Sequence, residues 1–300
     1  NRRKFIKTGL QVGGAGLMAS TLGCQGSLFD AFDSPAQEAI VAQTGTLNLY
    51  RVNLLTGSSS LMPLSFIGSN TRGIVLLDKN TLLVGIFDTA GGHLYKVDLK
   101  NNTPTLLLSN FTGGNRIMTI ALESDSSVLV GTDDNATTGN TIWRVNLVDL
   151  SVSVITNFAS SNFSGIVVEN NLSVLALNSI DKILYRINLL SGLATALSTA
   201  LGTTAVRLAY QPNRKVALIG HNATGNVIRF NLNTSTQLTD IGTLPNGAGQ
   251  GIALENSQSV LVGDTAGNGL YRVDLDTGVT SRVHDGTLNI NITAISVRFQ

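Results

Sequence analysis

The chain has 300 residues, of which 43% are hydrophobic and only 13% are charged, a balance that supplies a large core and excludes intrinsic disorder over most of the length. The net charge is +1, but four of the 20 Lys and Arg residues lie in the first seven positions, namely Arg2, Arg3, Lys4 and Lys7. The rest of the chain therefore has 16 basic and 19 acidic residues. A nucleic-acid binder needs a basic surface to neutralise phosphates, so this balance argues against that class of protein.

The first 24 residues resemble a bacterial export signal. Arg2, Arg3, Phe5 and Lys7 occupy the positions that define a twin-arginine signal, and an uncharged, Gly-rich stretch follows from residue 8 to residue 23. That stretch is too short and too weakly apolar for a membrane-spanning helix, which needs about 20 apolar residues. We therefore predict an export signal over 1–24, with a basic N-terminal arm as the alternative.

The single cysteine, Cys24, excludes an intrachain disulfide. It directly follows Gly23 at the end of the apolar stretch, as the lipidated cysteine of a bacterial lipoprotein does, although Thr21 stands where such signals carry Leu. This pattern favours a periplasmic or cell-surface protein that contacts the membrane only through a lipid on Cys24. Cleavage near this point, with a soluble periplasmic product, is the alternative. The polar segment 25–37, which contains Pro35, is predicted to be a linker.

A six-residue motif recurs six times in the remaining chain. It reads LYRVNL at 49–54, LYKVDL at 94–99, IWRVNL at 142–147, LYRINL at 184–189, VIRFNL at 227–232 and LYRVDL at 270–275. Successive motifs are 42 to 48 residues apart, which is the spacing of β-propeller blades. No segment after the signal has the 3.6-residue periodicity of a helix. The chain is therefore predicted to be all-β.

Each repeat contains four short β segments, and the two ends of the chain complete each other. In the second repeat the segments are 73–77, 82–85, 94–99 and 105–108. The last segment, 293–300, matches an inner strand, whereas the first repeat has no inner strand of its own. The sequence thus predicts a six-bladed β-propeller over 38–300, with four antiparallel strands per blade. The C-terminal strand joins three N-terminal strands, which closes the ring and protects the sheet edges.

The cation of the recurring motif lies two residues before Asn or Asp, so both side chains lie on one face of the third strand. Six cations could bind an anion, but they stand on an outer strand, far from the axis. We therefore predict that the Asn or Asp caps the following turn and that the cation pairs with the neighbouring blade. The cations are Arg51, Lys96, Arg144, Arg186, Arg229 and Arg272, and the capping residues are Asn53, Asp98, Asn146, Asn188, Asn231 and Asp274.

Function in a propeller usually lies where the repeats differ, and they differ most where the inner strands begin and the second strands end. Polar residues of both charges gather there and predict a mouth that binds a small polar ligand or a protein partner. For any single residue, a solvated loop is the alternative. The predicted ligand-binding residues are Arg72, Asp88, Asn115, Arg116, Asp133, Asn162, Asn178, Arg207, His221, Gln250 and Asp264.

The segments GIALE at 251–255, VLVGD at 260–264 and GLYRVD at 269–274 resemble the six-bladed propellers grouped with NHL repeats, YWTD repeats and the gluconolactonase/regucalcin enzymes. This resemblance covers nearly the whole chain after the signal and implies the architecture, whereas the group contains both enzymes and binding modules. Its gluconolactonase-type members hold a divalent metal at the axis with Glu, Asn and Asp ligands. Here Asn246 and Gly247 match part of that pattern, but no inner strand begins with Glu or Asp, and carboxylates provide most of the affinity for a hard cation.

The sequence therefore favours an exported, lipid-anchored, monomeric binding protein with no cofactor and no assigned catalytic residue. A metal-dependent lactonase, or a related hydrolase or lyase, is the alternative, with Ca²⁺ or another divalent metal at the axis. The acidic loop 133–139 is a second place for Ca²⁺, although it lacks the distal Glu of a calcium loop.

Overall fold

The structure is a computed structural model, and it describes residues 37–298 except 44, 90, 110, 112–114, 134–139, 159–161, 203–204, 246, 248, 265–268, 285–287 and 289. These residues belong to one compact unit of the chain, Phe32–Gln300. The predicted export signal with Arg2, Arg3, Phe5 and Lys7, the lipidation site Cys24 and nearly all of the predicted linker lie outside the described residues. Within the described part, no helix has the length and hydrophobicity needed to cross a bilayer.

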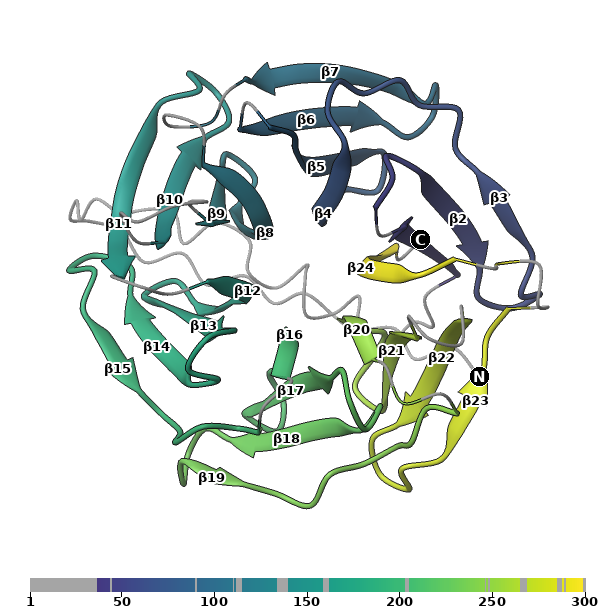
Figure 1. The fold of residues 1–300 in the computed structure, drawn as a ribbon, viewed down its shortest axis with the longest axis vertical. Coiled ribbons are helices and arrows are strands. Elements are labelled where there is room, and N and C mark those ends of the chain that lie inside the picture. Colours follow the sequence, from purple (N-terminus) through teal and green to yellow (C-terminus); the bar gives the residue numbers. More distant parts are fainter. Residues whose placement is uncertain are drawn as a thin grey trace, which may run out of the picture. The chain divides into compact units, whose positions relative to one another are not determined.

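The described residues form six antiparallel sheets of four strands each, arranged as blades around a central axis (Figure 1). Blade 1 contains β24 (Ile292–Arg298), β1 (Glu38–Gln43), β2 (Leu49–Asn53) and β3 (Ser59–Leu61). Blade 2 contains β4 (Asn70–Asp78), β5 (Thr81–Phe87), β6 (Gly92–Asp98) and β7 (Thr103–Leu108). Blade 3 contains β8 (Arg116–Ser124), β9 (Ser127–Asp133), β10 (Asn140–Asn146) and β11 (Val152–Phe158).

The other three blades follow the same order from the axis outward. Blade 4 contains β12 (Phe163–Asn170), β13 (Ser173–Asn178), β14 (Leu184–Asn188) and β15 (Ala194–Ala196). Blade 5 contains β16 (Ala205–Gln211), β17 (Val216–His221), β18 (Val227–Asn231) and β19 (Thr236–Gln237). Blade 6 contains β20 (Gly249–Leu254), β21 (Ser259–Asp264), β22 (Gly269–Asp274) and β23 (Thr280–Arg282). The predicted six-bladed, all-β propeller is confirmed.

The ring is closed by pairing the C-terminal strand with the N-terminal strand. β24 lies antiparallel to β1, in a register that runs from Glu38 opposite Arg298 to Gln43 opposite Ile292. In Figure 1, β24 accordingly lies at the inner side of blade 1, between the axis and β2. The prediction that one C-terminal strand joins three N-terminal strands is therefore confirmed.

The hydrophobic core is divided among the interfaces between neighbouring blades. One buried cluster, for example, joins Leu83 and Leu94 of blade 2 to Ile117, Val128 and Val130 of blade 3. Each inner and second strand lies between two other sheets, so both of its faces are buried and its sequence is a nearly continuous apolar run rather than an alternating one.

The Asn or Asp of the recurring motif caps the turn between the third and fourth strands. The Oδ1 atom of Asn53 accepts hydrogen bonds from the backbone N–H groups of Leu55 and Thr56, both at 2.9 Å. The equivalent pair of bonds forms at all six positions. The predicted capping role is therefore confirmed in every blade.

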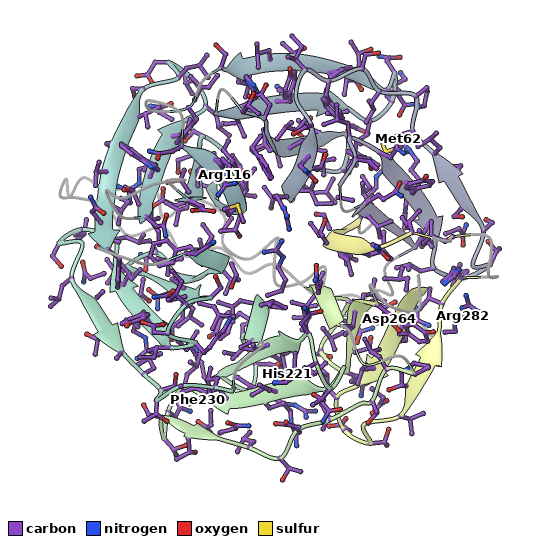
Figure 2. All side chains as sticks on the ribbon, in the orientation of Figure 1. Met62, Arg116, His221, Phe230, Asp264 and Arg282 are labelled. Atoms are coloured by element: carbon purple, nitrogen blue, oxygen red, sulfur yellow. The ribbon has the colours of Figure 1, made fainter. Side chains whose placement is uncertain are left out.

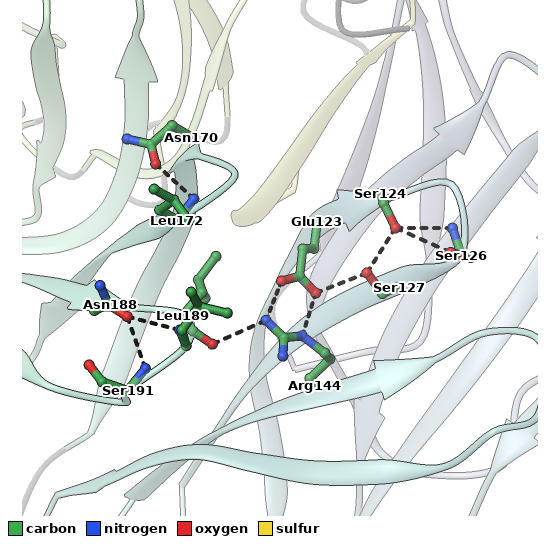
Figure 3. A network of polar contacts seen from close by, with 11 residues as sticks. Glu123, Ser124, Ser126, Ser127, Arg144, Asn170, Leu172, Asn188, Leu189 and Ser191 are labelled. Atoms are coloured by element: carbon green, nitrogen blue, oxygen red, sulfur yellow. Dashed lines mark hydrogen bonds and ion pairs between the residues drawn. The ribbon is translucent and has the colours of Figure 1, made fainter. Parts of the chain in front are cut away.

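The arginine of the motif connects its blade to the next one. Arg144 donates from Nη2 to the carbonyl oxygen of Leu189 in blade 4 at 3.4 Å (Figure 3). Arg51 and Arg229 donate in the same way to the next blade, to the carbonyl oxygens of Leu99 and Leu275. The predicted contact between blades is confirmed for these three arginines.

The arginines of three blades also pair with a glutamate that the sequence interpretation did not include. Arg144 binds Glu123 through Nε at 2.7 Å and Nη2 at 2.5 Å, and Glu123 stands near the end of the inner strand of the same blade (Figure 3). Arg186 with Glu169 and Arg272 with Glu255 repeat this two-bond geometry. Each pair therefore links the third strand of a blade to the end of the inner strand of the same blade.

Candidate functional site

Every inner strand has a β-bulge at the same place. In β4 the register shifts between Thr71 and Gly73, so Arg72 is the extra residue. The equivalent residues of the other inner strands are Met118, Ser164, Val206, Gln250 and Thr293. A bulge interrupts the ladder and redirects a side chain. The start of each inner strand, predicted from the sequence as the place where the repeats differ most, is a bulge near the axis.

Two arginines from neighbouring blades share one aromatic ring. The Cζ atom of Arg72 lies 5.7 Å from the ring centre of Phe87, and the Cζ atom of Arg116 lies 5.5 Å from it. Guanidinium groups are attracted to the face of an aromatic ring, which holds both cations at the end of β5. The Nε atoms of Arg72 and Arg116 are both buried, and neither has a hydrogen-bond partner in the described part of the chain.

A short polar network extends from Arg116 into blade 4. Arg116 donates from Nη2 to Oδ2 of Asp133 at 2.7 Å. The same carboxylate oxygen accepts a bond of 3.3 Å from Nδ2 of Asn162, and the backbone N–H of Asn162 donates to Oδ1 of Asn178 at 3.2 Å. Four predicted site residues, Arg116, Asp133, Asn162 and Asn178, therefore form one connected set.

Arg207 reaches across the axis from blade 5. Its Nε donates to the carbonyl oxygen of Thr293 in blade 1 at 2.9 Å, and its Nη1 donates to the carbonyl oxygen of Ser164 in blade 4 at 2.5 Å. Blade 6 separates blade 5 from blade 1 in the ring, so this side chain connects two blades that are not neighbours. No acidic residue of the described chain forms an ion pair with Arg207.

The charges of the three arginines interact. Burial lowers the pKa of Arg207 to about 10, and the positive charge of Arg72 contributes to that shift. The pKa of Arg72 is lowered by burial and then by Arg116, while Asp133 acts in the opposite direction. Arg72 and Arg207 thus each lie in the field of another arginine, which disfavours their charged form. We call Arg72, Arg116 and Arg207 the axial arginines.

The other predicted site residues have local partners. Asp88 contacts His93 at 3.1 Å and accepts the backbone N–H of Gly91 at 3.1 Å, and Nδ1 of His221 accepts the backbone N–H of Thr224 at 3.2 Å. Gln250 donates to Asn222 at 3.3 Å. Asp264 is fully buried at the end of β21, and Asn115 directly precedes β8. Figure 2 shows Arg116 in blade 3, with His221 and Asp264 on the opposite side of the ring.

Phe87 was not identified from the sequence. It directly precedes Asp88. The available signal was an aromatic residue at the end of the second strand of blade 2, level with Arg72 in the adjacent inner strand. The register confirms this placement, since Asn70 lies opposite Phe87 and Thr71 lies opposite Ile86.

The described residues at the axis do not fit a divalent metal of the gluconolactonase type. Among the described residues, no group of three His, Cys, Asp or Glu side chains is placed to hold a metal ion. The axis instead carries three guanidinium groups, whose positive charge repels a divalent cation. Asp133, the carboxylate next to them, is engaged by Arg116. Apart from Asp133, most of the acidic loop 133–139 lies outside the described residues.

Comparison with known proteins identifies the fold. No family model and no curated protein matches the sequence. A chain of a nidogen/laminin complex is similar with a TM-score of 0.72 and 12% identity, over 87% of this chain and 98% of that chain. TolB from Acinetobacter baumannii has a TM-score of 0.66 and 16% identity, over 88% of this chain and 66% of that chain. Regucalcin from Agrobacterium tumefaciens, described as a calcium-binding protein, has a TM-score of 0.58 and 16% identity, over 88% and 94%.

The shared property of these structures is the fold. The chain has the six-bladed β-propeller architecture found in TolB and regucalcin. At 12–16% identity this likeness does not extend to activity, because one propeller fold carries many unrelated functions.

Proposed function

We propose that this chain is an exported, lipid-anchored propeller that binds a ligand or a protein partner through its polar axial face. One observation carries the proposal, namely that three blades place Arg72, Arg116 and Arg207 around the axis, where Asp133 is the one carboxylate that pairs with them among the described residues. Buried polar groups without partners cost folding free energy, so a fold that contains two unpartnered guanidinium Nε atoms gains when a ligand satisfies them. Charged groups with perturbed pKa values are more frequent at binding sites than elsewhere.

A protein partner fits the fold as well as a small ligand does. The nidogen/laminin structure is a complex between proteins, so a similar propeller takes part in protein association. The axial face of this chain offers charged and amide side chains from blades 2 to 5. A partner would have to supply complementary groups at the axis, since charge complementarity fixes specificity and orientation.

Binding at the axial face is tested with one obstructing variant and one matched control. Asn162→Trp places a bulky side chain beside Asp133, and Leu190→Trp places the same side chain at an outer turn where Leu190 is 81% exposed. The folded chain is screened by calorimetry against anionic, neutral and cationic small molecules, and by affinity capture against bacterial proteins. We expect Asn162→Trp to abolish binding and Leu190→Trp to retain it. A ligand lost only in Leu190→Trp, or no ligand or partner at all, would contradict the proposal.

Export and anchoring are tested separately, on the chain with its N-terminal segment expressed in a bacterium. Mass spectrometry of the N-terminal peptide is expected to show a diacylglyceryl group on Cys24, and Cys24→Ser should release the protein from the membrane fraction. Replacing Arg2 and Arg3 together by Lys should stop export. An unmodified Cys24 in a soluble periplasmic protein would refute the anchor and leave the binding proposal intact.

A further inference from the structure

We propose that Arg72, Arg116 and Arg207 bind an oxyanion of charge −2, a dicarboxylate or a phosphate, at the propeller axis. This inference rests on the function proposed above and specifies the chemistry of the ligand.

The charge at the axis is unbalanced in the described chain. Guanidinium groups stay charged in proteins at neutral pH, and even the lowered pKa of Arg207, about 10, is well above 7. Asp133 compensates one of these charges through its 2.7 Å contact with Arg116. Two positive charges remain, and their mutual repulsion in a partly buried site is relieved by a ligand that carries two negative charges.

The arrangement leaves donors available for such a ligand. A guanidinium group has five N–H donors in a planar fork that matches the oxygens of carboxylate and phosphate. The side chain of Arg72 donates no hydrogen bond to any described residue, and the Nη2 atom of Arg207 donates none there either. Phe87 contacts the guanidinium groups of Arg72 and Arg116, and two backbone carbonyls accept hydrogen bonds from Arg207. The cations are therefore positioned before a ligand arrives, which reduces the entropy lost on binding.

Arg72 and Arg207 lack the carboxylate partner that three arginines of the third strands have among the described residues. On the third strands, Arg144, Arg186 and Arg272 each have a glutamate of their own that accepts two hydrogen bonds. Arg229, on the third strand of blade 5, instead donates to the backbone carbonyl oxygens of Thr239 and Leu275. At the axis, Arg72 and Arg207 have no such carboxylate among the described residues. A bound oxyanion would offer Arg72 and Arg207 the acceptor oxygens that Glu123, Glu169 and Glu255 offer to the outer arginines.

Isothermal titration calorimetry of the full chain tests the inference directly. The probes are inorganic phosphate and succinate, with acetate as a singly charged control at constant ionic strength. Arg72→Met and Arg207→Met remove axial charges, whereas Arg214→Met removes the same charge from an exposed pair with Asp276. We expect phosphate or succinate, and not acetate, to bind, with affinity at least ten-fold lower in the axial variants and within two-fold of the wild type in Arg214→Met. Tighter binding of phosphate than of succinate would indicate a phosphate ligand, and the reverse order would indicate a dicarboxylate.

A further variant protects the test against a folding defect. Arg72→Lys keeps the charge but loses the planar fork. The side chain of Arg72 makes no hydrogen bond to the described residues, so this variant should fold normally and bind the oxyanion more weakly than the wild type. Absence of binding by every oxyanion, or equal weakening by Arg214→Met, would overturn the inference. A neutral ligand or a protein partner that is lost in Asn162→Trp and retained in Arg72→Met would also overturn it, while leaving the proposed function standing.

Discussion

Closure of the ring can be tested at one side chain, that of Ile292. This residue begins β24 and is fully buried in a cluster of blades 1 and 6. Its Cβ and Cγ2 atoms lie 2.5 Å from the place where a Cβ atom on Gly263 would stand, and its Cγ2 lies 3.1 Å from the equivalent place on Gly251. Ile292 therefore packs directly on the backbone of blade 6, and it links the C-terminal strand to the preceding blade.

Replacing Ile292 by Ala removes three carbon atoms at a place that cannot close up. The surrounding wall is glycine backbone within paired strands, so the cavity persists and the cost falls in the upper half of the usual 2–5 kcal/mol range for this type of substitution, about 4 kcal/mol. For a domain of this size each kcal/mol lowers the melting temperature by about 2–4 °C, which gives a decrease of about 8–16 °C.

Differential scanning calorimetry and urea unfolding measure this change. Leu190→Ala is the matched control, because Leu190 is 81% exposed and exposed substitutions change stability by no more than about 0.5 kcal/mol. A chain that ends at residue 291 lacks β24 altogether and should not fold. If Ile292→Ala costs less than about 1 kcal/mol, or the truncated chain melts like the full one, the pairing of the two ends does not stabilise the ring.

Three further predictions concern other parts of the molecule. The side chain of Glu255 is 2% exposed and accepts two hydrogen bonds from Arg272, so Glu255→Gln should lower the free energy of unfolding, measured in urea, by about 2–3 kcal/mol. The control is Glu38→Gln, at a 3.6 Å pair with Arg51 in which the side chain of Glu38 is 24% exposed, and it should cost under about 1 kcal/mol. Equal losses in the two variants would refute the reasoning. Gly263→Ala should destabilise the protein by about 1–3 kcal/mol, because the added methyl group overlaps Ile292. The double variant with Ile292→Ala should lose less unfolding free energy than the sum of the two single losses, and strict additivity would disprove this coupling. Burial lowers the pKa of Arg207 to about 10, so its charge costs stability below that pH. This cost decreases as the pH rises from about 10 toward the ordinary pKa of arginine, because the folded chain then releases the proton before the unfolded chain does. Phosphate affinity should stay nearly constant between pH 7.5 and 9, fall as the pH drops below neutral and phosphate becomes singly charged, and fall near pH 10 in the wild type but not in Arg207→Met. A change of more than about three-fold between pH 7.5 and 9 would count against the axial arginines.

The repeat made the architecture predictable from the sequence, because each feature occurs six times. Closure of the ring was predictable from the ends alone, since 293–300 matches an inner strand and the first repeat lacks one. The capping role of residues such as Asn53 follows from local backbone geometry, which a short sequence segment contains.

The site was less predictable, because its contacts depend on which blades face each other. Arg116 and Asp133 belong to one blade and were predicted together, but their connection to Phe87 and Asn162 crosses two interfaces. Arg207 reaches the carbonyl of Thr293 across the axis, and this contact depends on the radius of the closed ring rather than on any local pattern. The glutamates that pair with the outer arginines were not predicted, because they lie at the ends of the inner strands, outside the recurring motif of the third strands.

The most direct test of the account is a crystal structure of the chain soaked with selenate, a doubly charged oxyanion whose selenium atom gives an anomalous signal. The account predicts a selenium peak at the propeller axis, with selenate oxygens within about 3.2 Å of guanidinium nitrogen atoms of Arg72 and Arg207. Selenium peaks confined to the outer surface, with none between the axial arginines, would contradict it.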